Sequence, residues 1–222
     1  MTRKRIAALA ASLSLVAVVG IGATLAYLSD QDQANNTVKM GKIDISLTEN
    51  QVTQDQDGNW VIDTSKPVTS DGLTFTDVYP GEKVEKNPTV HLEKGSGSAY
   101  IRMKMELDSK GSSFTKDDMN VLEMRLRQEI EADGEWKQGT DGYYYYNRIL
   151  TPEEDSAVFF ETVTLPGKEW GNNTQSQKFS IKLQAEAIQS DHFTPQTEDG
   201  NIIAWVDDRG NPIQAEGSTV DQ

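Results

Sequence analysis

Cysteine is absent from this chain of 222 residues. Disulfide bonds, thiolate metal sites and cysteine nucleophiles are therefore excluded, and a folded domain must rely on burial of its core. Histidine is scarce as well, because His91 and His192 are the only two. They form no H-E-x-x-H motif, and a three-ligand zinc site would need both of them together with a carboxylate. We therefore predict a protein that has no catalytic metal, no other cofactor and no enzymatic activity.

Positive charge is also limited, with 21 lysines and arginines against 35 aspartates and glutamates and a net charge of −14. The first 26 residues hold three basic residues and no acidic one, which leaves a net charge of −17 for the rest of the chain. Charge of this sign repels the phosphates of nucleic acids, so we predict no nucleic acid partner. An acidic surface suits a secreted protein, although it is equally a general means of staying soluble.

Only one long apolar run occurs, over residues 6–26, and it follows the three basic residues. It ends with Thr24 and Ala26, which are small residues at positions −3 and −1 relative to Tyr27. A basic region, an apolar region and a small-x-small end, in this order, are typical of a secretory signal peptide. The sequence therefore predicts a signal-peptide helix over residues 1–26, cleaved between Ala26 and Tyr27.

A retained membrane anchor is the alternative, because a run of 21 residues is long enough to span a bilayer. Gly20 and Gly22 weaken a helix near the proposed cut. Asp30 and Asp32 follow the run, where a stop-transfer signal would have basic residues. These features favour cleavage, so we expect contact with a membrane only through the uncleaved signal peptide.

The remainder of the chain alternates apolar and polar residues, a pattern that predicts half-buried strands. Asp-Gly pairs, which favour tight hairpin turns, separate several of these segments. Strands are expected at residues 40–48, 73–78, 84–92, 100–107, 121–131, 143–148, 158–165, 178–188 and 202–206.

This pattern predicts an all-β fold, a single jelly-roll-like β-sandwich over residues 40–206. Residues 207–222 lose the apolar pattern, so we expect them to form a flexible carboxyl-terminal tail.

Residues 121–131 carry two conflicting signals. Their strict alternation over ten residues favours a strand, which is the interpretation adopted here, while residues of high helix propensity make a helix the competing one. Just before them, a short helix over residues 115–120 is expected, with Thr115 as its N-cap and Asp118 three residues later.

Four consecutive tyrosines, Tyr143, Tyr144, Tyr145 and Tyr146, form the most unusual run. On a strand, two of the rings lie on each face. One pair can fill the core while the other is exposed to stack on a sugar or on a partner protein, which makes the tract a candidate ligand surface. Ordinary packing within the sheet is the alternative.

The run Asp55-Gln56-Asp57-Gly58-Asn59 is similar to part of a calcium-binding loop. With Gly58 in the sixth position of an EF-hand loop, Thr53 and Thr64 fall where the first and twelfth ligands should lie, so the match fails. Only weak cation binding at the surface stays open.

Residues 20–50 read GIGATLAYLSDQDQANNTVKMGKIDISLTEN, and they resemble the start of the TasA/camelysin family of secreted Gram-positive proteins. The order is that of the family: a Gly/Thr/Ala-rich end of the apolar run, an aromatic residue, a short acidic segment and a strand of the type G-x-[IL]-D-[IL]. Matching positions are Ala26-Tyr27, Ser29-Asp30, Gly41-Lys42-Ile43-Asp44-Ile45 and, more weakly, Tyr79–Val84, Asp141–Tyr146 and Ser180–Gln189.

The resemblance implies a jelly-roll subunit of extracellular fibres in a biofilm matrix, secreted to that matrix or to the cell surface. It also implies cleavage by a SipW-type signal peptidase during export. In fibre-forming relatives, the segment after the cut pairs as a strand with the next subunit, and here this segment is residues 27–39. We expect it to be loose in the free subunit and ordered only between subunits, because it has few apolar residues to bury on its own domain. Tyr27, Leu28 and Val38 are then the residues expected to fill pockets in a second copy of the chain or in a related matrix protein.

Two other functions are implied or left open by the sequence. Camelysin-type relatives are described as surface metallopeptidases, but the chain has no recognisable zinc motif. A secreted adhesin or carbohydrate-binding module that uses the tyrosine tract is the third alternative.

Overall fold

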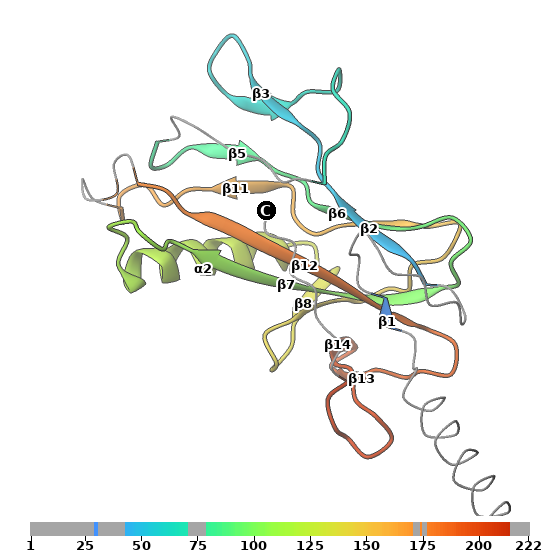
Figure 1. Cartoon of the computed structure of the whole chain (residues 1–222). Helices are drawn as coiled ribbons and strands as arrows, with labels where there is room; N and C mark the ends of the chain where they lie inside the picture. Colours follow the sequence, from blue (N-terminus) through green and yellow to red (C-terminus); the bar gives the residue numbers. More distant parts are fainter. Residues whose placement is uncertain (1–28, 31–42, 71–78, 171–173, 175–176, 214–222) are drawn as a thin grey trace, which may run out of the picture.

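The structure is a computed structural model, and it describes residues 29–30, 43–70, 79–170, 174 and 177–213 (Figure 1). Within these residues the chain is built from antiparallel strands and one helix, so the prediction of an all-β fold is confirmed. No helix in this part of the chain is long and apolar enough to cross a membrane. The predicted signal peptide, residues 1–26, and the predicted strand at 73–78 lie outside the described residues.

The largest sheet has five strands in the order β1-β12-β7-β9-β8. Its two long strands pair along their whole length, from Ser180 opposite Asp108 to Gln189 opposite Ala99. The strands of this sheet are β1 (Ser29–Asp30), β12 (Ser180–Gln189), β7 (Ala99–Asp108), β9 (Tyr144–Tyr146) and β8 (Trp136–Gln138).

A second layer faces this sheet across the core (Figure 1). It contains the sheet β10-β6-β2 and the pair β11-β5, and two separate hairpins complete the fold. The strands are β2 (Ile45–Thr48), β5 (Lys83–Glu85), β6 (Thr89–Leu92), β10 (Ser156–Val158) and β11 (Thr162–Thr164), with the hairpins β3 (Val52–Gln54)–β4 (Trp60–Ile62) and β13 (Gln196–Glu198)–β14 (Asn201–Ala204). Two facing layers agree with a β-sandwich, and the jelly-roll strand order stays a prediction.

The strands predicted at residues 84–92 and 158–165 are each interrupted. The first divides into β5 and β6 around Pro88, which has no N–H to donate to a ladder. The second divides into β11 and β10, which pair with β5 and β6 respectively. Across the break the N–H of Phe159 donates to the carbonyl of Pro88 at 2.8 Å, so the two partners stay side by side.

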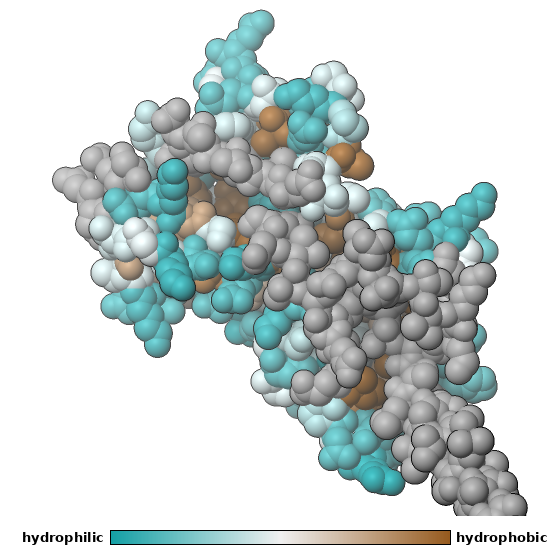
Figure 2. Space-filling model, in the orientation of Figure 1, coloured by the Kyte–Doolittle hydropathy of each residue, from teal (hydrophilic) through white to brown (hydrophobic). Residues whose placement is uncertain are grey.

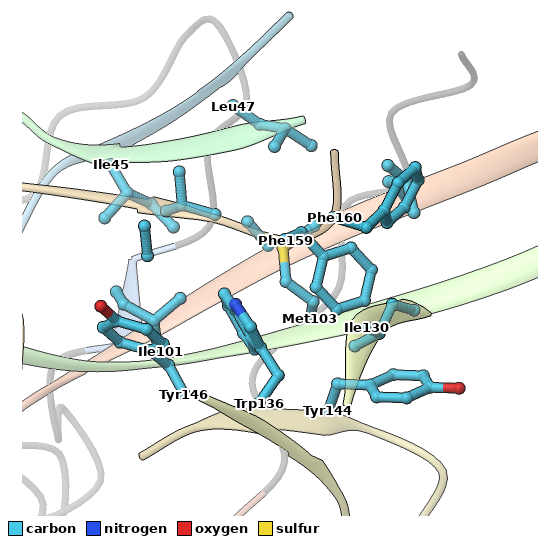
Figure 3. Packing of buried hydrophobic residues seen from close by; sticks show 14 of the residues in the cluster. Ile45, Leu47, Ile101, Met103, Ile130, Trp136, Tyr144, Tyr146, Phe159 and Phe160 are labelled. Carbon is cyan, nitrogen blue, oxygen red and sulfur yellow. The ribbon is translucent and has the colours of Figure 1, made fainter. Parts of the chain in front are cut away.

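The main core lies between the two layers and is rich in aromatic residues (Figure 3). Trp136 packs against Tyr146 with ring centroids 5.0 Å apart, and it meets Phe159 at the same distance in an edge-to-face arrangement. Ile101 and Met103 of β7 are fully buried among these rings. Edge-to-face and tilted ring pairs stabilise a fold beyond the burial of their apolar area. This cluster therefore stabilises a domain that has no disulfide bond.

The strand predicted at residues 121–131 is wrong, because the structure has helix α2 at Lys116–Ile130. The competing pattern explains the difference: Leu122, Leu126 and Ile130 recur at four-residue spacing and are the buried positions. Met124, which completed the alternation, is 55% exposed. The helix therefore buries one stripe on the core and leaves its opposite face to solvent.

The predicted N-cap of α2 is confirmed. Thr115 accepts a hydrogen bond from the N–H of Asp118 at 3.1 Å, and the Asp118 carboxylate accepts one from the N–H of Thr115 at 2.8 Å. This reciprocal capping box satisfies amides that would otherwise lack a partner at the start of the helix. The short helix predicted at residues 115–120 is thus the first part of α2, which has 15 residues and about four turns.

A buried ion pair joins the end of β2 to the residue after β5. Lys86 donates to Glu49, and their side chains are 6% and 0% exposed. Burial lowers the pKa of Lys86, against the opposing attraction of the Glu49 carboxylate. The second carboxylate oxygen of Glu49 finds no hydrogen-bond partner among the described residues. Glu49 is therefore the partner that compensates the buried charge of Lys86.

Candidate strand-pairing site at the edge of β12

The strand β12 is the second strand of the five-stranded sheet. On its outer side it pairs only with β1, which is two residues long, among the described strands (Figure 1). Ser29 lies opposite Ile188, and Asp30 lies opposite Ala187. Along residues 180–186 no strand in the described part of the chain pairs with this side of β12. An edge of this kind presents N–H and C=O groups to which another strand can bond.

The two faces of β12 differ in chemistry. Leu183, Ala185 and Ala187 belong to the main core, which confirms the alternation predicted for this segment. The intervening residues, which include Gln184 and Glu186, point to the opposite face of the sheet. Glu186 is fully buried there, which is rare for a carboxylate and requires a partner.

Arg102 on the neighbouring strand β7 is that partner. It lies directly opposite Glu186, and its Nε and Nη2 approach the Glu186 Oε2 at 2.7 and 2.6 Å. The other oxygen of the carboxylate accepts hydrogen bonds from the hydroxyl of Tyr143 at 3.1 Å and from Nε2 of Gln184 at 3.0 Å. All the acceptor positions of this buried carboxylate are thus filled from within the chain, so the edge strand carries a charge without an unsatisfied group.

The guanidinium of Arg102 is enclosed by aromatic rings. It lies 4.0 Å from the centre of the Tyr143 ring and 4.5 Å from that of Trp205, which are favourable cation–π distances. Its Nη2 also donates to the carbonyl of Ile213 at 3.2 Å. Burial works against the charge of Arg102, but the Glu186 carboxylate and the Tyr145 hydroxyl outweigh it, so the pKa of Arg102 lies above its ordinary value.

The carboxyl-terminal segment covers this network. Of the tail predicted at residues 207–222, residues 207–213 are described and fold back so that the N–H of Ile213 donates to the carbonyl of Trp205 at 2.9 Å. Trp205, Ile202, Ile188 and Tyr145 form a second apolar cluster on this face of the sheet. The backbone of β14 lies close to that of Gly139, the residue after β8. A Cβ added at Gly139 would lie 2.2 Å from the carbonyl oxygen of Ile203.

The tyrosine tract is divided between the two clusters. Tyr144 and Tyr146 face the main core, and Tyr145 faces the second cluster, which confirms that the rings alternate between two faces. The predicted exposure of one pair is wrong, because Tyr145 is fully buried and Tyr143 is half-buried against Arg102. The physical reason is the carboxyl-terminal segment, which covers the face expected to meet solvent.

The hydroxyl groups of the tract differ in their bonding. Tyr145 donates to Asp141 at 2.6 Å, and burial together with this bond raises its pKa. The hydroxyl of Tyr144 finds no hydrogen-bond partner among the described residues, and burial raises its pKa to about 12. These hydroxyls are therefore not available to a ligand at neutral pH without unfolding the surrounding packing.

The two histidines serve no common centre. His91 lies on β6, where its Nε2 is 2.9 Å from the hydroxyl of Thr48. His192 lies in an exposed turn with a backbone φ of 62°. In the part of the chain that the structure describes, no group of three His, Asp or Glu residues is placed to hold a metal ion.

The carboxylate of Asp55, in the acidic loop after β3, binds to groups of its own loop. The Asp55 carboxylate accepts hydrogen bonds from the N–H groups of Asp57 and Asn59 and from the side chain of Asn59, at 2.8–3.1 Å. These bonds, chiefly those from Asn59, lower the pKa of Asp55. The carboxylate therefore closes the hairpin turn and has little capacity left for the weak cation site considered above.

The predicted cleavage residues Ala26 and Tyr27 and the predicted pocket-filling residues Leu28 and Val38 lie outside the described residues. Sequence reasoning missed Arg102 and Glu186, which it assigned to a polar strand face. The sequence shows a positive and a negative residue in two predicted strands. It does not show that they lie opposite each other, because that depends on the register of β7 and β12.

Taken together, the described residues form an all-β protein whose longest sheet ends in a strand edge that the chain's own amino-terminal residues reach. A family model described as camelysin metallo-endopeptidase matches residues 2–59. The resemblance to the TasA/camelysin family is thus confirmed over this stretch, which spans the predicted signal peptide, residues 27–39 and the strands β2 and β3. No curated protein and no solved structure is significantly similar to the chain.

Proposed function

We propose that the chain is a secreted structural protein of an extracellular biofilm matrix, a fibre subunit or an accessory protein that assembles by strand addition at the edge of β12. The observation that carries this proposal is the pairing of Ser29–Asp30 with Ala187–Ile188. It brings residues from near the start of the predicted donor segment, 27–39, to an edge that is otherwise unpaired among the described strands. The expectation that this segment is loose in the free subunit is therefore wrong at Ser29–Asp30, which pair with their own chain. The amino-terminal family match supports export.

The length and register of the edge support the same proposal. The two pairs of β1 and β12 share one antiparallel register, in which Ser29 lies opposite Ile188 and Asp30 opposite Ala187. Continued along the ten residues of β12 in a neighbouring subunit, this register would pair β12 with residues 28–37. That stretch falls within residues 27–39, so the donor segment and the acceptor edge agree in length.

Side-chain burial decides whether strand pairing at this edge is favourable. Ordering a residue costs about 1–2 kcal/mol of backbone entropy, and each backbone hydrogen bond returns on the order of 1 kcal/mol net. Two paired residues therefore contribute almost nothing to stability, and a strand of ten gains only when side chains are buried with it. Because head-to-tail addition is heterologous, it propagates a filament and does not close a dimer.

Assembly of the mature chain tests this proposal. Protein that begins at Tyr27 should form filaments visible by negative-stain electron microscopy. A variant that begins at Gly41 should keep its β-type circular dichroism, because the core strands start at Ile43, yet it should stay monomeric. Equal polymerisation of both proteins would refute strand addition and indicate side-by-side contacts.

A surface metallopeptidase is the second candidate, because the matching family model is described as a camelysin metallo-endopeptidase. Catalytic zinc sites in such enzymes typically have three protein ligands and one open position. Casein cleavage that is lost with a chelator, together with stoichiometric zinc that is lost in His91→Ala or His192→Ala, would establish this function. Full fibre assembly by a protein that has no stoichiometric zinc would favour the structural role.

A further inference from the structure

The pairing of Ser29–Asp30 has a consequence for assembly. These residues bond to Ala187–Ile188 of their own chain, at one end of the ten-residue strand β12. A strand has only one outward set of backbone groups on that side. A strand from a second subunit therefore cannot pair with Ala187–Ile188 while Ser29–Asp30 of the same chain occupy them.

We propose that Ser29–Asp30 form an intrachain clip that occupies the acceptor edge of the subunit, so that addition of the next subunit is a displacement reaction. The proposal rests on the proposed function, since it concerns the same edge. It adds that the free subunit is held back by its own amino-terminal segment. A subunit then elongates a filament only after the clip has been replaced by the incoming strand.

The clip is placed at the more buried end of β12. Ala187 and Ile188 are fully buried, one in each apolar cluster. The adjacent Glu186 is fixed from behind by Arg102. The opposite end of the strand is less buried, because Ser180 and Ile181 are only partly covered. Because residues 180–186 have no partner on this side among the described strands, an incoming strand can begin there and reach the clip last.

Tethering makes the clip a competitor at low subunit concentration. A segment joined to its site by a short linker acts at an effective concentration on the order of mM. The two-residue clip contributes little to the stability of the fold, but free subunits at μM concentration make the same two pairs at a disadvantage of about a thousandfold, before the extra pairs of a longer strand are counted. Dilute subunits are therefore expected to stay apart, and crowded subunits to assemble.

A disulfide tests the clip in the full mature chain. Residues directly opposite in an antiparallel ladder have Cα atoms about 4.5–5.5 Å apart, which suits a disulfide, and the chain has no cysteine of its own. The double variant Ser29→Cys/Ile188→Cys is oxidised in dilute solution, so that the clip is locked within one chain. The matched control Thr53→Cys/Val61→Cys places a disulfide across the hairpin β3–β4, away from the edge.

Assembly is then followed by light scattering and electron microscopy for the oxidised and the reduced form of each variant. We expect the locked clip to assemble at least about tenfold more slowly than its reduced form, because the edge can no longer be vacated, and the control pair to assemble equally in both forms. The neighbouring pair Asp30→Cys/Ala187→Cys repeats the test at the adjacent rung.

The outcomes separate the two proposals. Failure of both edge pairs to form an intrachain disulfide in the dilute free subunit overturns the clip and leaves strand addition standing. Equal assembly of the oxidised and reduced forms overturns strand addition at this edge as well, because a locked chain can neither vacate its own β12 nor donate residues 29–30 to a neighbour. A chain that begins at Tyr27 and forms no filaments, even when it has no substitution, overturns the proposed function itself.

Discussion

Replacing Arg102 by methionine should destabilise the protein more than any other single change on the outer face of the large sheet. The substitution keeps the apolar stem and removes the guanidinium, which is 3% exposed and bonds to a Glu186 side chain that is 1% exposed. Removing one partner of a buried ion pair typically costs about 3–5 kcal/mol, since the other charge is left without compensation. The cation–π contacts with Tyr143 and Trp205 are lost at the same time.

Urea unfolding followed by tryptophan fluorescence measures this cost. For a denaturant dependence of about 2 kcal/mol per M, the loss lowers the unfolding midpoint by on the order of 2 M. Lys104→Met is the matched control, because Lys104 lies on the same face of β7 but is exposed, and it should shift the free energy of unfolding by less than about 0.5 kcal/mol.

A second substitution separates the ion pair from general packing. Adding Glu186→Leu to Arg102→Met removes the orphaned charge, so the double variant should recover much of the lost stability. A free energy of unfolding for Arg102→Met within about 1 kcal/mol of the original chain would refute the argument that this network secures the edge strand.

Four further predictions concern stability. Tyr144→Phe should change the free energy of unfolding by less than about 0.5 kcal/mol, because its hydroxyl has no partner among the described residues, whereas Tyr145→Phe, which loses bonds to charged groups, should cost about 1.5–3 kcal/mol in the same urea titration. The pKa of Tyr144 is raised from 10.0 to about 12, so the native state holds this proton more tightly and stability should fall by on the order of 2–3 kcal/mol as pH rises from 10 through 12; a pH-independent midpoint for the original chain, or an equal fall in Tyr144→Phe, would contradict this. Thr115→Ala should cost about 1 kcal/mol in thermal unfolding and Thr115→Ser much less, because serine keeps the cap; equal losses would argue against the capping box. Lys86→Met should cost about 3–5 kcal/mol in urea unfolding, and the double variant with Glu49→Leu should restore most of it; a double variant as unstable as Lys86→Met would contradict the role of the orphaned Glu49 charge.

The strands were predictable because one face of each is buried in a continuous core. Along β2 and β12 the apolar residues alternate, and Ile45, Leu47, Leu183 and Ala185 are buried as the pattern requires. The helix was missed because residues 121–131 satisfy two periods at once. Capping and four-residue spacing were the better guides there, since they describe backbone bonding and core contact together.

The buried network was not predictable from local sequence. Arg102 is buried because β12 and the carboxyl-terminal segment meet it, and its partners Glu186 and Ile213 lie 84 and 111 residues away along the chain. The same segment covers Tyr145, which on strand periodicity alone would face solvent. Contacts between segments so distant depend on the topology of the whole domain, and no pattern within a strand encodes it.

Mixing two single-cysteine variants of the mature chain tests the central claim most directly. One carries Ser29→Cys and the other Ile188→Cys, the two positions that lie opposite each other at the edge of β12. Under assembly conditions followed by mild oxidation, strand addition between subunits predicts a disulfide-linked heterodimer of the two chains, which neither variant forms alone and which Thr53→Cys mixed with Val61→Cys does not form. Filaments that assemble from the mixture without any such heterodimer would contradict the account, because the amino-terminal segment would then not be paired with the β12 edge of a neighbour.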